Sequence, residues 1–256
     1  ISFISPKKMP DDSINQQKQN RFLEVMTANP EINKQRRMMI SQAKVGAEYI
    51  AELMKRRHLT PETTTILDIG CGGRHTRESG YEYEYFPYFL GHLSDLGFTP
   101  ENMYGVDIGV QNQDLTELYT HLQLNLVPHF TLDPNNARKK IYESMEDYAD
   151  RLFMQLPESL KQRLSDSVLL LCSNNFFANM DPTLLSLVDP EFLKEYLEYF
   201  FSRFAKVGSV MITFDESNNE EVVQGPSVFV INEQNKLIEN KEEDSILKLK
   251  FYNDDY

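Results

Sequence analysis

The chain has 256 residues, of which 41% are hydrophobic and 25% are charged, and its formal net charge at pH 7 is −13. This length and apolar content suit one large domain, or a domain with an appendage, that buries a sizeable core. Residues 1–60 carry 11 Lys/Arg against 6 Asp/Glu, whereas the remaining residues carry 15 against 33. The acidic surface expected for residues 61–256 would repel DNA or RNA, which makes nucleic acid an unlikely partner. A small molecule or a protein is expected instead.

The compartment is predicted from what the sequence lacks. No run approaches the roughly 18 apolar residues of a membrane span, and residues 1–20 lack the apolar stretch of a secretory signal. Cys71 and Cys172 are too few for a disulfide framework and have no metal-ligand spacing around them. We therefore expect a cytoplasmic protein with no membrane span and no metal site, whose oligomeric state the sequence does not indicate.

The N-terminal part is predicted to be helical. After a polar stretch, one helix is expected at about residues 17–27 and a longer one at residues 31–57. The longer segment carries an apolar stripe at helical spacing: Met39, Ala43, Ala47, Ile50 and Met54. We expect residues 1–60 to form a helical extension that packs on an α/β domain of residues 61–256.

The next segment has the pattern of a strand, a turn, a helix and a strand. Residues 64–73 read Thr-Thr-Ile-Leu-Asp-Ile-Gly-Cys-Gly-Gly and residues 102–109 read Asn-Met-Tyr-Gly-Val-Asp-Ile-Gly, with a helical pattern at residues 86–96 between them. Each apolar run stops at a carboxylate, as buried parallel strands do at a ligand crevice. Glycines after the first strand let a ligand lie against the backbone, and Asp107 can accept two hydrogen bonds from a ribose diol.

These two motifs resemble a known family. Residues 67–73 resemble the first motif of the class I S-adenosylmethionine-dependent methyltransferases, and residues 106–109 resemble the second. An NAD site is disfavoured, because its glycine motif would need glycine where His75 stands. The resemblance implies S-adenosylmethionine as cofactor and a cofactor site made of Asp68, Gly70, Cys71, Gly72, Gly73, Asp107, Ile108, Asn125, Leu126, Ser173 and Asn174. In it the glycines would line the methionine part, Asp68 would orient the turn or the amine, and Asp107 would take the ribose hydroxyls.

Four positions depart from the family pattern. Arg74 replaces the third glycine, and Asn125 stands where an acidic residue often contacts the adenine, next to Leu126. Asn174 and Asn175 replace the prolines of the amino-methyltransferase motif, so an adenine or cytosine amino-methyltransferase is not expected.

An insertion is expected after the glycine turn. Asp68 and Asp107 are 39 residues apart, about twice the separation of a minimal unit, and residues 74–84 account for the excess. This segment, rich in Arg, His and Tyr, either recognises substrate over the crevice or is a surface loop that covers the helix below. No catalytic residue is assigned; His75, Tyr81 and Asn175 are candidates.

The rest of the chain continues an α/β pattern. Strands are expected at residues 119–127, 167–172, 209–214, 228–232 and 246–252, and helices at residues 133–164 and 189–208. Asp133 followed by Pro134 is a helix-start signal. The run at residues 167–172 is typical of a central parallel strand, and its end should lie beside the glycine turn. The last two strands resemble the antiparallel sixth and seventh strands of the family.

The predicted fold is α/β: a doubly wound seven-stranded mixed sheet, Rossmann-like as in these methyltransferases, with additional N-terminal helices. The expected function is methyl transfer from S-adenosylmethionine to a small-molecule or protein acceptor. The alternative is a methyltransferase-like domain that binds the cofactor weakly or not at all and acts as a binding or scaffold protein.

Overall fold

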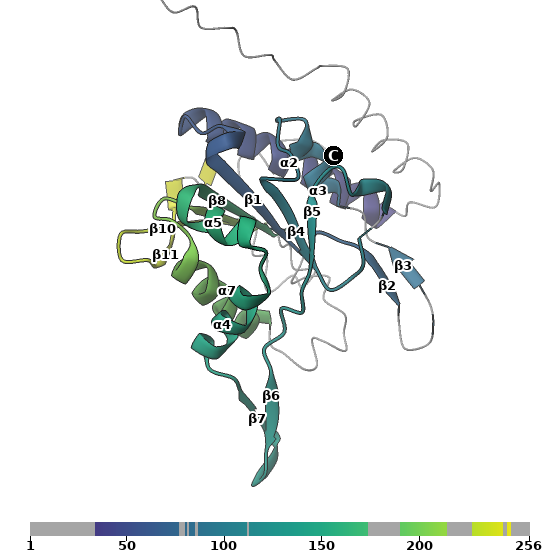
Figure 1. Cartoon of the computed structure of the whole chain (residues 1–256), viewed down its shortest axis with the longest axis vertical. Coiled ribbons are helices and arrows are strands. Elements are labelled where there is room, and N and C mark those ends of the chain that lie inside the picture. The colour runs from purple at the N-terminus through teal and green to yellow at the C-terminus, as the bar shows by residue number, and fades with distance from the viewer. Residues whose placement is uncertain are drawn as a thin grey trace, which may run out of the picture.

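The architecture is a mixed α/β fold around a parallel sheet (Figure 1). The computed structural model describes residues 34–76, 80, 82–84, 87–111, 113–173, 190–213, 227–242 and 245–246. The strands of the main sheet lie in the order β11-β10-β9-β8-β1-β4-β5. Their bounds are β1 (Thr64–Ile69), β4 (Met103–Asp107), β5 (Thr120–Gln123), β8 (Val168–Ser173), β9 (Val210–Thr213), β10 (Ser227–Ile231) and β11 (Leu237–Glu239).

The central strands run in one direction. β1 pairs in parallel with β4 and with β8, and the parallel pairs β4–β5 and β8–β9 extend the sheet on either side. β10 is antiparallel to β9, and β11 is antiparallel to β10. Every residue of β1 is buried, as expected for a strand covered on both faces. Such an arrangement is compatible with a Rossmann-like fold and brings the carboxyl ends of the parallel strands to one edge.

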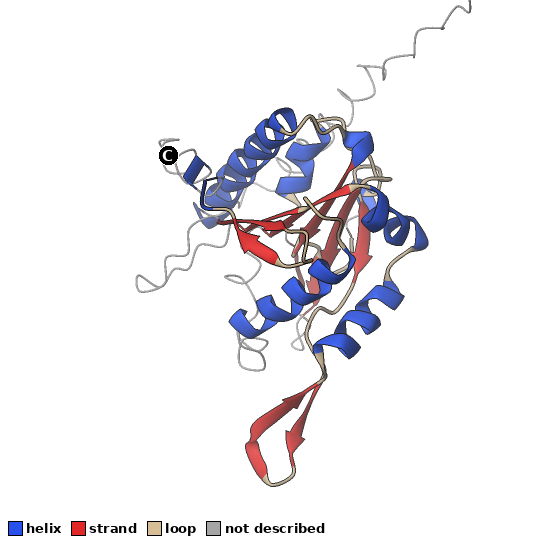
Figure 2. Cartoon of the chain, turned by 90° about the vertical axis from the view of Figure 1, so that its left-hand side faces the viewer, coloured by secondary structure: helices blue, strands red, loops and turns tan. Residues whose placement is uncertain are grey.

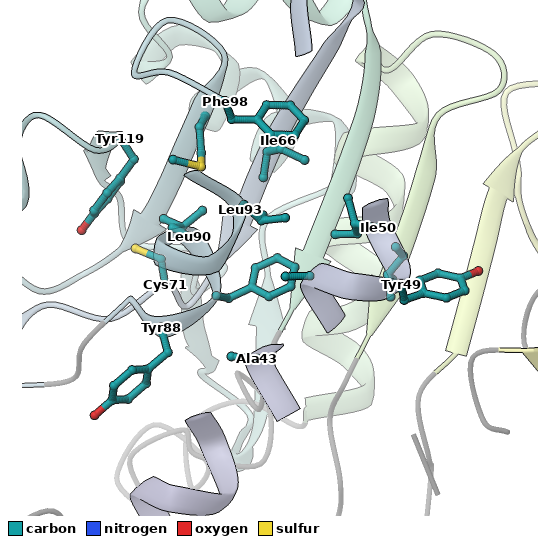
Figure 3. Packing of buried hydrophobic residues seen from close by; sticks show 14 of the residues in the cluster. Ala43, Tyr49, Ile50, Ile66, Cys71, Tyr88, Leu90, Leu93, Phe98 and Tyr119 are labelled. Carbon is teal, nitrogen blue, oxygen red and sulfur yellow. The ribbon is translucent and has the colours of Figure 1, made fainter. Parts of the chain in front are cut away.

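Helices cover both faces of the sheet (Figure 2). On one face α2 (Lys34–Arg56) and α3 (Tyr88–Ser94) pack on a cluster that includes Ile66 and Met103. On the other face α4 (Met145–Gln155), α5 (Glu158–Asp166) and α7 (Pro190–Phe204) pack on Leu67 and Val106. Side chains of consecutive strand residues thus enter opposite layers, as the strand period requires. Figure 3 shows part of the first layer, with Ile50, Leu90 and Ile66 gathered from α2, α3 and β1.

The long N-terminal helix was predicted closely. The described side chains of the expected stripe are all buried in the first layer, so α2 packs directly on the core: Ala43, Ala47, Ile50 and Met54. The side chain of Met39 and the helix expected at residues 17–27 lie outside the described residues. Within the described part of the chain, no helix is long and apolar enough to cross a membrane.

The prediction of a helix at residues 133–164 is wrong for its first part, residues 133–142. Residues 130–142 form an antiparallel hairpin of β6 (Phe130–Asp133) and β7 (Asn136–Tyr142). Asp133 Oδ1 accepts a hydrogen bond from Asn135 N at 2.9 Å, so the Asp-Pro pair makes a turn instead of a helix start. The helix α4 begins only after Ser144, whose hydroxyl accepts from Asp147 N at 3.0 Å. Pro157 separates α4 from α5, as predicted.

The end of the sheet holds a strand that the sequence did not predict. β10 confirms the strand expected at residues 228–232, whereas the strand expected at residues 246–252 lies outside the described residues except for residue 246, which is helical. β11 falls between these two predicted strands. The cause is a tight turn: Asn232 Oδ1 accepts from Gln234 N at 3.0 Å and from Lys236 N at 2.9 Å, and Asn235 has a φ of 55°.

Candidate functional site

The candidate site lies at the carboxyl edge of the sheet, where β1 and β4 end side by side. Gly70 and Gly72 follow β1 with φ angles of 70° and 100°, a backbone region that favours glycine. Gly70 N and Cys71 N both donate to Val106 O, at 2.8 and 3.2 Å. The glycine turn is therefore folded back on the end of β4, which brings it against Asp107.

Asp107 faces this turn, as the sequence predicted. Its Oδ2 accepts from Gly72 N at 3.1 Å, and its Oδ1 accepts from Gly109 N at 2.7 Å. His75 Nε2 lies 3.1 Å from the same Oδ1. Burial raises the pKa of Asp107, but the close contact with the His75 ring and the hydrogen bonds from the two amides outweigh it, so the pKa is lowered overall. The carboxylate is ionised, and both of its oxygens already accept hydrogen bonds from the protein.

The predicted insertion is a second hairpin, made of β2 (Arg74–Thr76) and β3 (Glu82–Glu84). Its first strand also bridges to the segment after β4: Arg74 N donates to Val110 O at 2.8 Å, and Val110 N donates to Arg74 O at 2.9 Å. The Arg74 side chain points to solvent, while the His75 ring is carried onto Asp107. Tyr81 lies outside the described residues.

Two glycines serve this close approach of chain segments. A Cβ added to Gly73 would lie 3.1 Å from the carbonyl carbon of Gly109, and one added to Gly109 would lie 2.7 Å from His75 Nε2. The sequence predicted that Gly73 would make room for a ligand. In the structure it makes room for the backbone that follows β4, and Gly109 makes room for His75.

Asp68 is a buried acid beneath the turn. Asp68 stands one residue before the end of β1 with 2% of its surface exposed, and its Oδ1 has no hydrogen-bond partner among the described residues. Burial, and then the neighbouring Asp107 carboxylate, raise the pKa of Asp68 well above its usual range. The edge therefore holds two unlike carboxyl groups, since the pKa of Asp107 is lowered and the pKa of Asp68 is raised.

A cysteine–histidine contact at this edge was missed by the sequence analysis. Cys71 Sγ lies 3.8 Å from His121 Nδ1, and His121 Nε2 lies 2.9 Å from Gly109 O. Because a carbonyl only accepts, Nε2 of His121 donates to Gly109 O, while the Cys71 thiol donates to Gly72 O at 3.3 Å. Burial, then Asp68 and Asp107, raise the pKa of Cys71 well above its usual range, so it is a thiol and not an activated nucleophile.

The register of the sheet is the signal that could have found this contact. His121 in β5 lies opposite Gly105 in β4, one strand from the end of β1. A Cβ added to Gly105 would lie 2.6 Å from Cys71 Sγ, so the glycine opens the space that the thiol fills.

The residues expected around an adenine differ in their exposure to solvent. Ile108 is 48% exposed beyond Asp107, and Asn125 is exposed with its Oδ1 accepting from Val127 N at 3.0 Å. Leu126, in contrast, is buried in the core beside Tyr148, whose hydroxyl donates to Leu126 O at 2.9 Å. Ile108 and Asn125 are thus accessible from solvent, whereas Leu126 is a packing residue.

At the end of β8 the structure describes the backbone alone. Ser173 pairs in register with Ile69 of β1 and with Thr213 of β9, so its backbone lies one strand from the glycine turn. The side chains of Ser173 and Cys172, and the whole of Asn174 and Asn175, lie outside what the structure describes. Over the described ranges, no cluster of three or more His, Cys, Asp or Glu side chains could hold a metal ion.

Comparison with known proteins adds no relative. No protein-family model matches the chain, and no curated protein and no solved structure matches it.

Proposed function

We propose that the chain is an S-adenosylmethionine-dependent methyltransferase acting on a small-molecule or protein acceptor. One observation carries this proposal: Gly72 N lies 3.1 Å from Asp107 Oδ2, so a glycine turn and an ionised carboxylate meet at the tips of adjacent parallel strands. This is the arrangement by which α/β sheets hold a nucleoside, with the ribose diol on the carboxylate and the remainder of the ligand against the backbone. The Rossmann-like methyltransferase sheet, with an antiparallel β10 after five parallel strands, is part of the same proposal.

The proposed cofactor contacts follow from the groups at this edge. The unpartnered, buried Oδ1 of Asp68 would meet the ammonium group of the methionine part, and a cation there would ionise this acid. Asp107 would accept the ribose hydroxyls once His75 has left its Oδ1. Ile108, exposed beside Asp107, would pack on the adenine, and Asn125 would lie at the rim.

The chemistry asked of the protein is modest. The bound cofactor would supply a methyl group that is already electrophilic. The chain's own residues would align the acceptor with that group and exclude water. An acceptor that is already ionised needs no general base. His75 is engaged with Asp107, so it could act as a base only after leaving the carboxylate.

The contact between His75 and Asp107 favours a second candidate function. His75 and two backbone amides already satisfy the Asp107 carboxylate, and the Arg74–Val110 bridge holds the segment carrying His75 against the end of β4. A cofactor must displace His75 before it can bind. If it cannot, the fold is a methyltransferase-like scaffold that acts through protein contacts.

Calorimetric titration with S-adenosylhomocysteine separates the two functions. We expect heat of binding with the wild-type chain and an affinity at least roughly tenfold weaker for Asp107→Asn, since a charge-assisted hydrogen bond contributes about 1.5–3 kcal/mol. Glu233→Gln makes the same change in charge at an exposed turn and should bind like the wild type. No heat from the folded wild-type chain at high micromolar ligand would reject the transferase in favour of the scaffold.

A further inference from the structure

The chain that leaves β4 is fastened to β5 through its carbonyl groups. We call residues 107–110 the Asp107 loop. Three consecutive carbonyl oxygens of this loop accept hydrogen bonds from β5 and the residue after it: Asp107 O from Leu124 N at 3.1 Å, Ile108 O from Gln123 Nε2 at 3.2 Å, and Gly109 O from His121 Nε2 at 2.9 Å. His121 and Gln123 are two positions apart in the strand, so their side chains leave the same face of the sheet.

The hydrogen bond from Gln123 orients the peptide that binds the Asp107 carboxylate. A trans peptide is planar, and its C=O and N–H point in opposite directions. Ile108 O and Gly109 N belong to one peptide, so the donor on Ile108 O turns Gly109 N–H away from Gln123. That N–H donates to Asp107 Oδ1 at 2.7 Å, the shortest of the three contacts described for this carboxylate.

The hydrogen bond from His121 orients the next peptide of the loop. The carbonyl of this peptide accepts from the ring, and its N–H, on Val110, donates to Arg74 O at 2.9 Å. Arg74 directly precedes His75 in β2, and His75 Nε2 lies 3.1 Å from Asp107 Oδ1. His121 therefore acts on the carboxylate through the strand that carries His75.

The His121 ring is itself held by neighbours from the core. Cys71 Sγ lies 3.8 Å from its Nδ1, and the Tyr119 ring packs edge-on against it, with the ring centroids 6.0 Å apart. Figure 3 shows the Cys71 sulfur near the Tyr119 ring. Gly105 leaves room for both, because a Cβ there would lie 2.6 Å from the sulfur and 2.8 Å from Tyr119 Cε2. A ring held by packing in this way keeps its Nε2 directed at the loop.

We propose that His121 and Gln123 are positioning residues for the Asp107 carboxylate: they orient the two peptides that bring Gly109 N–H and the His75 ring onto its Oδ1. The inference deepens the proposed function and rests on it for its role in binding, because Asp107 is the group that would take the ribose hydroxyls. Neither β5 side chain needs to touch the ligand. A carboxylate that is already oriented before binding requires less ordering when the ligand arrives.

Titration of Asp107 in the full chain tests this role without a ligand. Burial raises the pKa of this carboxyl, whereas the contacts with His75 and the two amides lower it below its usual value. Carbon-13 NMR of the aspartate-labelled chain follows the carboxyl carbon, which Asp107→Asn assigns. We expect Gln123→Met and His121→Phe, which remove the donor and keep a side chain of similar size, each to raise the Asp107 pKa. His121→Gln keeps a donor near the position of Nε2 and should restore the wild-type titration.

A second measurement, at neutral pH, is hydrogen exchange of the Gly109 amide. We expect exchange about tenfold faster in Gln123→Met, because the amide is no longer directed at the carboxylate. Gln155→Met is the matched control, since the exposed Gln155 amide also donates to a backbone carbonyl, Arg151 O, at 3.1 Å. It should change neither measurement. Thermal melting of every variant checks that the fold is kept.

The proposal is overturned if Gln123→Met and Gln155→Met give the same Asp107 titration and the same Gly109 exchange. It is also overturned if His121→Phe leaves the titration unchanged, or if His121→Gln does not restore it. In calorimetry with S-adenosylhomocysteine, Gln123→Met should weaken binding roughly threefold to tenfold, and Gln155→Met should not. A wild-type chain that does not bind this ligand would reject the proposed function alone, because both NMR measurements decide the role of β5 in its absence.

Discussion

Gly109→Ala tests the packing of His75 on the segment after β4. The added Cβ would lie 2.7 Å from His75 Nε2, 2.9 Å from His75 Cε1 and 3.0 Å from Arg74 O, all closer than ordinary van der Waals contact. Gly109 does not have a left-handed φ, so alanine itself fits the backbone. Overpacking typically costs about 1–3 kcal/mol, and restricting the unfolded chain returns about 0.4–1 kcal/mol. We expect a net loss of about 1–2 kcal/mol in the free energy of unfolding.

The two closest atoms belong to the His75 ring, so its removal should relieve most of this cost. In a His75→Ala background Arg74 O alone remains of the three closest atoms, and we expect Gly109→Ala to cost less than about 1 kcal/mol there. Urea denaturation followed by circular dichroism measures the double-mutant cycle. His129→Ala, at an exposed position just before β6, serves as the control. Its effect on the free energy of unfolding should add to that of Gly109→Ala. Additivity of the His75 pair as well would refute the packing described for this ring.

The remaining predictions concern the ion pair between Glu143 and Arg151, Asp68 and His75. Glu143→Gln removes the charge of that ion pair, so it should cost about 1–3 kcal/mol of unfolding free energy and speed amide exchange in the β6–β7 hairpin. The exposed Glu117→Gln should do neither. Burial raises the pKa of Asp68, so its contribution to stability is lost as the pH rises above its unfolded pKa of about 4. Asp68→Asn should therefore flatten the decline in stability that begins above about pH 4, and an unchanged slope of unfolding free energy against pH in urea denaturation would contradict this. His75→Ala should tighten S-adenosylhomocysteine binding roughly tenfold by calorimetry, and unchanged affinity would show that His75 does not compete.

The sequence predicted best the elements whose side chains repeat with a clear period. The positions of β1, β8 and α2 followed from their apolar patterns, and the side chains of β1 and of the described stripe on α2 are buried, because burial on these faces dominates their energetics. It failed where a short polar stretch decides the direction of the chain. The turns at Asp133 and Asn232 are made by side-chain oxygens that bind nearby backbone amides, and such residues also begin helices or fill loops.

The sequence predicted that the glycine turn and Asp107 meet, but it did not predict their partners within the protein. Parallel strands bring their carboxyl ends together, so the meeting of the glycine turn with Asp107 followed from the pattern alone. The contact between Cys71 and His121 joins residues 50 apart and depends on the register of β5. The insertion was located, but nothing in its composition shows that it folds as a hairpin that lays His75 on the carboxylate.

The two carboxylate oxygens of Asp107 contact protein donors, and a ligand would have to bind the same oxygens. The number of acceptor positions on the carboxylate shows which of the present contacts a ligand would have to displace. A carboxylate offers about four lone-pair positions, and three of those on Asp107 face Gly72 N, Gly109 N and His75 Nε2. A ribose diol brings two hydroxyl donors, so it needs the remaining position and the one that His75 holds. Both amide bonds that shape the glycine turn could then persist while the ligand binds. Whether this edge is a cofactor site or a closed structural joint therefore depends on the free energy of moving one imidazole ring.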